Sequence, residues 1–408
     1  MNELHILRDL ENSVGVYRNV SKSPLLTAFS DMISSFEEDD KTFFYDSYGE
    51  FIGELAKTGS LNFPKAVYEM VLSDDNPFSK AAAGKIYIPG LYNAAEKELK
   101  ILSDISNITP DEILKLAGVT ESIKGSLVKW ECKNSPFGDD DKQRVQKIYE
   151  YYGGHGCGIF SRYGAFVWQD RTLVPVENPD PITFADLKGY EAQRKTVIDN
   201  TTAFLEGKAC NNVLLYGDRG TGKSSTVHAL LNEFTDRGLR LIELPKSAIT
   251  DFHCVISRLS KIPMKFIIFI DDLSFSEDND GFAALKAALE GGVAARPQNM
   301  LVYATSNRRH LLKETFTKRD GDDLHLNDTM QEQLSLSDRF GLTVTFTNPD
   351  RANFYEILDA IAEDRGLEIP PEILHEAAEK WALRKGGRSP RIAKQFIDTL
   401  IGMPDYEI

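Results

Sequence analysis

The sequence predicts an α/β fold with a parallel sheet of five strands at its centre. From residue 187 onward, short apolar segments alternate with helical segments, and several apolar segments lack a polar face, as buried parallel strands require. The pattern is wholly helical after residue 347 and mainly helical before residue 182. We therefore expect a mainly helical N-terminal domain with a terminal β-hairpin at residues 1–181, an α/β core at residues 182–347 and a helical lid at residues 348–408.

Length and composition set the class of protein. A chain of 408 residues is too long for one ordinary core, and its 42% hydrophobic and 27% charged residues are typical of soluble globular proteins. The first residues, MNELHILRDLENS, carry charges where a signal peptide needs an apolar run, and the most apolar stretch, 266–270, is too short to cross a bilayer. The four cysteines lack CxxC spacing, which favours a reducing compartment. We expect a cytoplasmic protein without membrane contact.

Net charge limits the partners. The formal charge of −15 argues against a large, non-specific nucleic-acid footprint, so nucleic acid is not the favoured partner. The basic clusters Arg308–Arg309 and Arg384–Arg388 are the candidates for a small contact patch, although solvated surface charges explain them better. The seven histidines are scattered, and no transition-metal site is indicated.

The N-terminal domain is expected to consist of short helices joined by polar turns. Thr109 is followed by a proline and, three residues on, by Glu112, which is the pattern of a capping box at a helix start. Residues 139–154 place acids before and glycine after a helical segment. Residues 158–176 are aromatic and β-branched, which predicts a hairpin, and the proline-rich segment 177–190 predicts the domain boundary.

The core is expected to alternate strands and helices. The helices are predicted at residues 191–207, 223–238, 247–260 and 281–292, and the strands at residues 212–217, 239–245, 265–271, 299–307 and 342–346.

A glycine-rich loop joins the first of these strands to a helix. It matches the pattern G-x-x-x-x-G-K-[ST] (Walker A) completely. In such a loop, backbone N–H groups surround the phosphates of a nucleoside triphosphate, the lysine adds a positive charge and the hydroxyl ligates Mg²⁺. The sequence therefore predicts ATP and Mg²⁺ as ligands, with these binding residues: Gly217, Asp218, Arg219, Gly220, Thr221, Gly222, Lys223, Ser224 and Ser225.

Polar residues end two further strands. Asp271 and Asp272 follow an apolar strand, as in a Walker B motif, so we expect Asp271 to hold Mg²⁺ with Ser224, and Asp272 to orient or deprotonate the attacking water. Residues 305–307 end the next strand. If that strand lies between the other two, a side chain there reaches the γ-phosphate, and Asn307 is our choice, with Thr305 and Ser306 as neighbours. An ordinary polar strand end is the alternative.

Two arginines complete the set of candidates. Arg339 precedes the last strand, and Arg391 begins a helix of the C-terminal region. Each alone is typical of a surface charge. The order of all five signals changes that interpretation, because it resembles the order in the AAA+ ATPases from residue 181 to the end.

This resemblance implies further roles. The segment at residues 182–207 looks like the AAA+ box before the first strand, which places Leu187 and Gly189 beside adenine. Arg339 looks like the arginine finger, and Arg391 like the sensor-two arginine of the lid. More closely, "NNVLLYGDRGTGKSS" and "LSDRFGL" resemble the uncharacterised bacterial ATPases of domain of unknown function 815. One difference is that Asp272 stands where most members have glutamate, which implies slow hydrolysis.

The expected function is ATP hydrolysis in a homo-oligomer that remodels or loads a macromolecular partner, with the N-terminal domain binding a protein client. Two alternatives remain open at this point: a helicase-loader-like ATPase associated with DNA, and a nucleotide-bound scaffold with negligible hydrolysis. The segment GGHGCG contains His155 and Cys157, a pair that suggests a thiol nucleophile. No third group that would orient them is visible, so a turn is the better interpretation.

Overall fold

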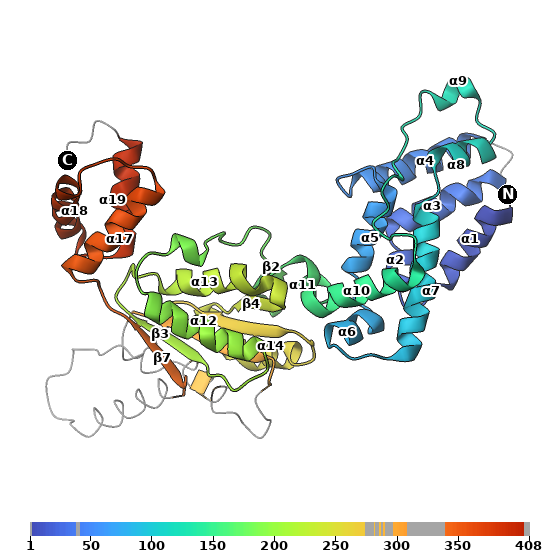
Figure 1. Cartoon of the computed structure of the whole chain (residues 1–408). Coiled ribbons are helices and arrows are strands. Elements are labelled where there is room, and N and C mark those ends of the chain that lie inside the picture. The colour runs from blue at the N-terminus through green and yellow to red at the C-terminus, as the bar shows by residue number, and fades with distance from the viewer. Residues whose placement is uncertain are drawn as a thin grey trace. The chain divides into compact units, whose positions relative to one another are not determined.

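The computed structural model describes residues 2–37, 41–273, 297–307 and 339–403, together with residues 281, 285, 286 and 289. Contacts divide the chain into two compact units, Met1–Arg162 and Tyr163–Ile408 (Figure 1). The boundary therefore lies near residue 162 and not at 181 as predicted. Within the described residues, no helix has the length and apolar character needed to cross a membrane.

The first unit is helical, as the sequence predicts. Its helices are α1 (Asn2–Ser13), α2 (Arg18–Ser21), α3 (Pro24–Ser34), α4 (Lys41–Ala56), α5 (Phe63–Leu72), α6 (Pro77–Ala83), α7 (Pro89–Ser106), α8 (Pro110–Leu116), α9 (Glu121–Lys124), α10 (Asp141–His155) and α11 (Ile159–Arg162), with the 3₁₀ helix η1 (Ser35–Glu37). The capping box that starts α8 is present, because Thr109 accepts from the Glu112 N–H and Glu112 accepts from the Thr109 N–H.

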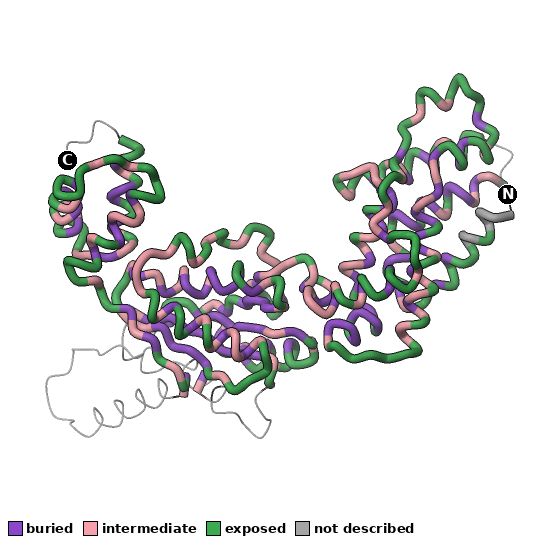
Figure 2. The backbone as a smooth tube through the Cα atoms, in the orientation of Figure 1, coloured by how far each residue is buried: buried purple, intermediate pink, exposed green. Residues whose placement is uncertain are grey.

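Aromatic side chains fill the interior of this unit. The rings of Phe29, Phe51 and Phe63 lie within 4.9–5.3 Å of one another, and Trp130 packs edge-on against Phe51. These residues belong to one continuous buried cluster, the purple interior of the helices in Figure 2.

Within the described residues, the second unit is built on a mixed sheet of seven strands. The strands are β1 (Ala165–Gln169), β2 (Thr172–Pro175), β3 (Val213–Gly217), β4 (Leu239–Glu243), β5 (Lys265–Ile270), β6 (Met300–Ser306) and β7 (Leu342–Phe346), in the order β2-β1-β4-β5-β6-β3-β7. All neighbours are parallel except β1 and β2.

The predicted five strands are all present as β3 to β7, but the strand number is wrong. The hairpin β1–β2, which we assigned to the N-terminal domain, extends this sheet, because Ala165 to Val167 pair with Leu241 to Glu243 of β4. Backbone pairing between segments more than 70 residues apart leaves no mark on the local pattern of either segment. The hairpin was therefore recognisable from sequence, whereas its sheet was not.

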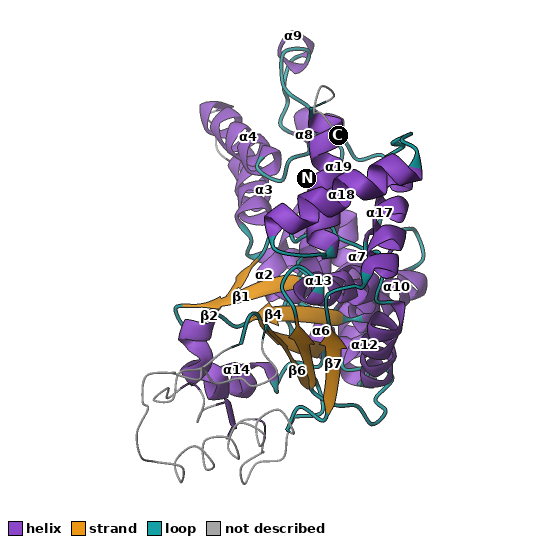
Figure 3. Cartoon of the chain, turned by 90° about the vertical axis from the view of Figure 1, so that its left-hand side faces the viewer, coloured by secondary structure: helices purple, strands orange, loops and turns teal. Residues whose placement is uncertain are grey.

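Helices cover both faces of the sheet (Figure 3). Helices α12 (Glu191–Leu205) and α13 (Lys223–Phe234) share one buried cluster with alternate residues of β3 to β7, whereas α14 (Phe252–Leu259) lies on the other side. Three short 3₁₀ helices, η2 (Phe184–Asp186), η3 (Thr235–Arg237) and η4 (Lys246–Asp251), connect these elements. The helix expected at residues 281–292 lies largely outside the described residues.

Up to residue 403, where the described part of the chain ends, three helices follow the sheet: α17 (Arg351–Asp364), α18 (Pro371–Lys385) and α19 (Pro390–Gly402). They enclose a hydrophobic cluster of their own, to which Tyr190 contributes from the segment before α12. The Tyr190 hydroxyl donates to the Thr347 carbonyl at 2.6 Å, and its ring packs on Phe346. Tyr190 thus connects the end of β7 with the C-terminal helices.

Candidate nucleotide-binding site

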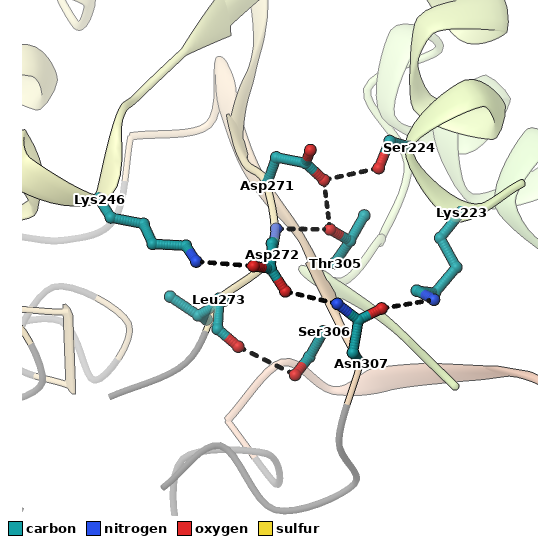
Figure 4. A network of polar contacts seen from close by, with 9 residues as sticks. All are labelled: Lys223, Ser224, Lys246, Asp271, Asp272, Leu273, Thr305, Ser306 and Asn307. Atoms are coloured by element: carbon teal, nitrogen blue, oxygen red, sulfur yellow. Dashed lines mark hydrogen bonds and ion pairs between the residues drawn. The ribbon is translucent and has the colours of Figure 1, made fainter. Parts of the chain in front are cut away.

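The carboxyl ends of three parallel strands meet at one edge of the sheet. Strand β6 lies between β3 and β5, as the sequence-based argument for Asn307 assumed. In this order, the glycine loop after β3, the two aspartates after β5 and Asn307 after β6 lie side by side (Figure 4). Ligands of open α/β sheets bind at this edge.

The glycine loop is held against the end of β7. A Cβ atom on Gly217, whose φ is +137°, would lie 2.0 Å from the Phe346 carbonyl oxygen, so only glycine fits there. The Asp218 N–H donates to that same oxygen at 2.8 Å, and the Thr221 hydroxyl donates to the Asp218 carbonyl at 2.8 Å. The loop leads into α13 at Lys223, and the amino end of that helix favours an anion.

Lys223 is buried beneath this loop. Its Nζ donates to the carbonyls of Gly217 at 2.9 Å and Asp218 at 2.6 Å, and to Asn307 Oδ1 at 3.2 Å. Burial lowers the pKa of the amine from its ordinary value, because removal from water penalises the charged form. A nearby polyanion would act in the opposite direction and favour the charged amine. Arg219, by contrast, lies exposed on the loop.

The two predicted magnesium ligands lie in contact. Asp271 Oδ1 accepts from the Ser224 hydroxyl at 2.6 Å and from the Thr305 hydroxyl at 2.5 Å. Carboxylate and hydroxyl oxygens are the protein ligands that Mg²⁺ takes, and it usually completes its shell with water and phosphate oxygens. The donor set beside the amino end of α13 therefore fits a magnesium–triphosphate complex.

Asp272 is held at three points. Its φ of +50° places it in the left-handed region, and its N–H donates to the Thr305 hydroxyl at 2.8 Å. Its carboxylate accepts from Asn307 Nδ2 at 2.6 Å and from Lys246 Nζ at 3.0 Å. Since Asn307 also accepts from Lys223, one chain of polar contacts joins the loop lysine to the second aspartate (Figure 4).

Sequence reasoning missed Lys246 and the part played by Thr305. Lys246 begins η4, three residues after β4 ends, and β4 is the neighbour of β5. The available signal was its position: a charged residue that follows a strand of a parallel sheet lies at the same edge as those that follow the other strands.

A cleft of about 860 Å³ opens between the glycine loop and the C-terminal helices. It is lined by Leu187, Gly220, Arg391 and Lys394, among others. The Arg391 N–H donates to the Gly220 carbonyl at 3.1 Å, which ties the start of α19 to the loop. Leu187 thus lines this cleft, and Gly189 packs against α17, where an added Cβ would lie 2.8 Å from Ile357.

Arg339 is not brought to this edge of the sheet. Leu342 pairs with Val213 and Phe346 with Gly217, so β7 begins at the end of the sheet opposite the glycine loop. Four residues of strand separate these two ends by about 13 Å, and Arg339 precedes even Leu342.

The surroundings of Cys157 do not favour thiol chemistry. Burial raises the pKa of Cys157 to about 11, which makes its thiol a poor nucleophile at neutral pH. No group of three or more His, Cys, Asp or Glu residues placed to hold a metal ion is found in the described part of the chain.

Comparison with known proteins finds one family model and two partly covered relatives. A family model described as "Protein of unknown function (DUF815)" matches residues 161–404, starting where the second unit starts. The replication factor C large subunit of Nanoarchaeum equitans is 24% identical over 231 residues, which are 54% of this chain and 46% of that protein. The same subunit of Thermofilum pendens is 31% identical over 131 residues, 29% and 31% of the two chains.

Among solved structures, the Thermotoga maritima RuvB Holliday junction branch migration motor matches with 17% identity and a TM-score of 0.38, over 55% of this chain and 65% of that one. The chain thus spans less than half of either replication factor C relative and about two thirds of this structure.

Proposed function

We propose that this chain binds and hydrolyses ATP as an AAA+ ATPase. It belongs to the family described as "Protein of unknown function (DUF815)", whose model matches residues 161–404. One observation supports the proposal most: the contacts that run from Ser224 and Lys223 on the glycine loop to Asp271, Asp272 and Asn307 at the neighbouring strand ends. These are the groups that phosphoryl transfer to water needs at one place.

Each group has a role in this proposal. Backbone N–H groups of the loop and Lys223 hold the phosphates, and Ser224 and Asp271 hold Mg²⁺, which when bound neutralises phosphate charge. Asp272 accepts a proton from the attacking water, and Asn307 orients that water. Lys246 and Asn307 each donate to one Asp272 oxygen, which leaves fewer acceptor positions for the attacking water. This restriction, with the short aspartate side chain, supports slow hydrolysis.

The hydrolysis proposal is tested by Asp272→Asn. The amide keeps the shape and tolerates the left-handed backbone, but it cannot take a proton, so ATP binding should persist while turnover falls by ~10²–10⁴. The matched control is Asp170→Asn, because Asp170 has a similar φ of +48° at the tip of the β1–β2 hairpin. Phosphate release should be measured for both variants. Parent-like turnover in Asp272→Asn would exclude Asp272 as the base.

We further propose that the active form is a homo-oligomer in which Arg339 acts on a neighbouring subunit. Its position at the opposite end of β7 from its own glycine loop supports action in trans. Loss of such an arginine costs ~10³–10⁵ in turnover.

Mixing two inactive variants tests this arrangement. Lys223→Ala subunits lack the site but keep the arginine, and Arg339→Ala subunits keep the site but lack the arginine. A mixture of these two variants should regain part of the activity. The control is a mixture of Lys223→Ala with Arg258→Ala, a substitution in α14. In that mixture, only the nucleotide sites of the Arg258→Ala subunits should hydrolyse ATP. Mixed oligomers without recovery would contradict action in trans.

We propose that the N-terminal unit recognises a protein client that the ATPase remodels or loads. All the proposed nucleotide-contacting residues follow Arg162, so this unit is not needed for the chemistry. Its surface exposes three consecutive large hydrophobic residues, Ile86, Tyr87 and Ile88. A truncation that tests the client role must start at Tyr163, because a start at Ile182 would remove β1 and β2 from the sheet.

A further inference from the structure

Thr305 connects the two aspartates of the site. It is the sixth residue of β6 and only 2% exposed, and its hydroxyl lies between the ends of β5 and β6. Its Oγ1 donates to Asp271 Oδ1 at 2.5 Å and accepts from the Asp272 N–H at 2.8 Å. Its carbonyl accepts from the Leu273 N–H at 2.6 Å. Three consecutive residues after β5 are therefore bound to this one residue.

The Thr305 hydroxyl both donates and accepts a hydrogen bond. A hydroxyl has one proton to donate, and here that proton goes to Asp271, while a lone pair receives the Asp272 N–H. A valine of the same shape could make neither bond, and a serine could make both. These two substitutions therefore distinguish a requirement for the hydroxyl from a requirement for a β-branched residue in the strand.

The bond to Asp271 orients a carboxylate that faces the glycine loop. Asp271 Oδ1 accepts from both Thr305 and Ser224, so Thr305 holds that oxygen toward the serine with which it would share Mg²⁺. Groups that hydrogen-bond to metal ligands fix their orientation, and their loss commonly costs 10–100-fold in metal affinity.

The bond to the Asp272 N–H acts on the backbone. Asp272 has a φ of +50°, a conformation that aspartate adopts more readily than most residues with a side chain but that still favours glycine. Thr305 stabilises this turn, and the turn directs the Asp272 carboxylate to Asn307, the residue two places after Thr305.

We propose that Thr305 is a positioning residue of the site: its hydroxyl orients Asp271 toward Mg²⁺ and fixes the turn that directs Asp272. This inference rests on the proposed function, and it adds a specific requirement for magnesium. Thr305→Val should lower the apparent Mg²⁺ affinity of the ATP complex by ~10–100-fold. Affinity for ATP in the absence of Mg²⁺ should stay at the parent value, since in the proposed arrangement the glycine loop, and not the Thr305 hydroxyl, holds the phosphates.

The test measures binding and not activity. ATP affinity is determined by calorimetry at a series of Mg²⁺ concentrations for the parent, Thr305→Val and Thr305→Ser, and Mn²⁺ binding to each ATP complex is followed by electron paramagnetic resonance. Thr305→Ser should restore the parent Mg²⁺ dependence. Thr201→Val is the matched control, because Thr201 is a fully buried hydroxyl in the same unit that bonds to Val197 and Tyr303, away from the aspartates.

The outcomes distinguish a failure of the proposed ATPase function from a failure of the role given to Thr305. A parent that binds no ATP overturns the proposed function and this role together. A parent that binds ATP while Thr305→Val keeps the parent Mg²⁺ dependence, or while Thr305→Ser behaves as Thr305→Val, overturns only the role of Thr305. If Thr305→Val does not fold, Thr305→Ala, which adds no bulk, gives the same comparison, with the same loss of Mg²⁺ affinity expected.

Discussion

The two units of the molecule use charged groups in different ways. In the helical unit, the Glu98 carboxylate accepts from the backbone N–H groups of Gly15, Val16 and Tyr17 at 2.9–3.1 Å. Arg144 likewise donates to the carbonyls of Phe137 and Gly138. In the second unit, the carboxylates at the strand ends accept from side chains: Asp271 from Ser224 and Thr305, and Asp272 from Asn307 and Lys246. Lys223 donates to Asn307 as well as to two carbonyls of the glycine loop.

This difference teaches how to separate structural from functional polar clusters. A charged group that bonds to the backbone of a turn fixes that turn, and its loss costs free energy of unfolding. Charged side chains that bond to one another at the carboxyl ends of parallel strands line a site where a bound ligand can take over their hydrogen bonds. Substitutions in the first unit should therefore change stability without changing ATP binding, and substitutions at the strand ends should do the reverse.

The largest effect on stability is expected from Glu98→Ala. Three N–H groups of the turn after α1 lose a charged acceptor, so the unfolding of the first unit should become easier by about 1.5–3 kcal/mol. Urea denaturation measures this change, and Glu96→Ala on the same helix is the control. ATP affinity should match the parent. If Glu98→Ala folds but no longer binds ATP, the distinction between the two units is contradicted.

A smaller and pH-dependent effect is expected from Glu11→Gln. Glu11 is 2% exposed, and burial raises the pKa of its carboxyl to about 7. Because the folded pKa lies above the unfolded value of 4.5, the stability that the protonated group contributes is present below pH 4.5 and is lost as the pH rises through 7.

The amide variant should therefore equal the parent near pH 4 and be more stable above pH 7. We expect a gain on the order of 1 kcal/mol, since a buried amide also carries a desolvation cost. Thermal unfolding at pH 4, 6 and 8 measures it. A difference between variant and parent that does not change with pH would contradict the role given to the carboxyl.

The sequence predicted the parts of this molecule that local pattern determines. The capping box at Thr109 and Glu112 needs only residues three apart, and the glycine loop needs only one strand, one turn and one helix. The grouping of Asp271 and Asn307 followed once β6 was assumed to lie between β3 and β5, because parallel strands end at a common edge.

The remainder depended on pairing between distant segments. The β1–β2 hairpin joins β4 through backbone hydrogen bonds that its own residues do not encode, so the predicted boundary fell about twenty residues too late. Lys246 could not be connected with Asp272 until β4 was known to lie beside β5. The position of Gly189 against Ile357 likewise depends on how α17 folds back.

The most direct measurement is the calorimetric titration of ATP with Mg²⁺ into the parent, Lys223→Ala and Lys208→Ala, an exposed lysine in the same unit. Lys223 is the buried cation of the glycine loop and contacts both the loop and Asn307. We expect the parent and Lys208→Ala to bind ATP equally, and Lys223→Ala to lose about 2–5 kcal/mol of binding free energy. Equal affinity in all three proteins, or no binding by the parent, would contradict the central claim that this loop holds ATP.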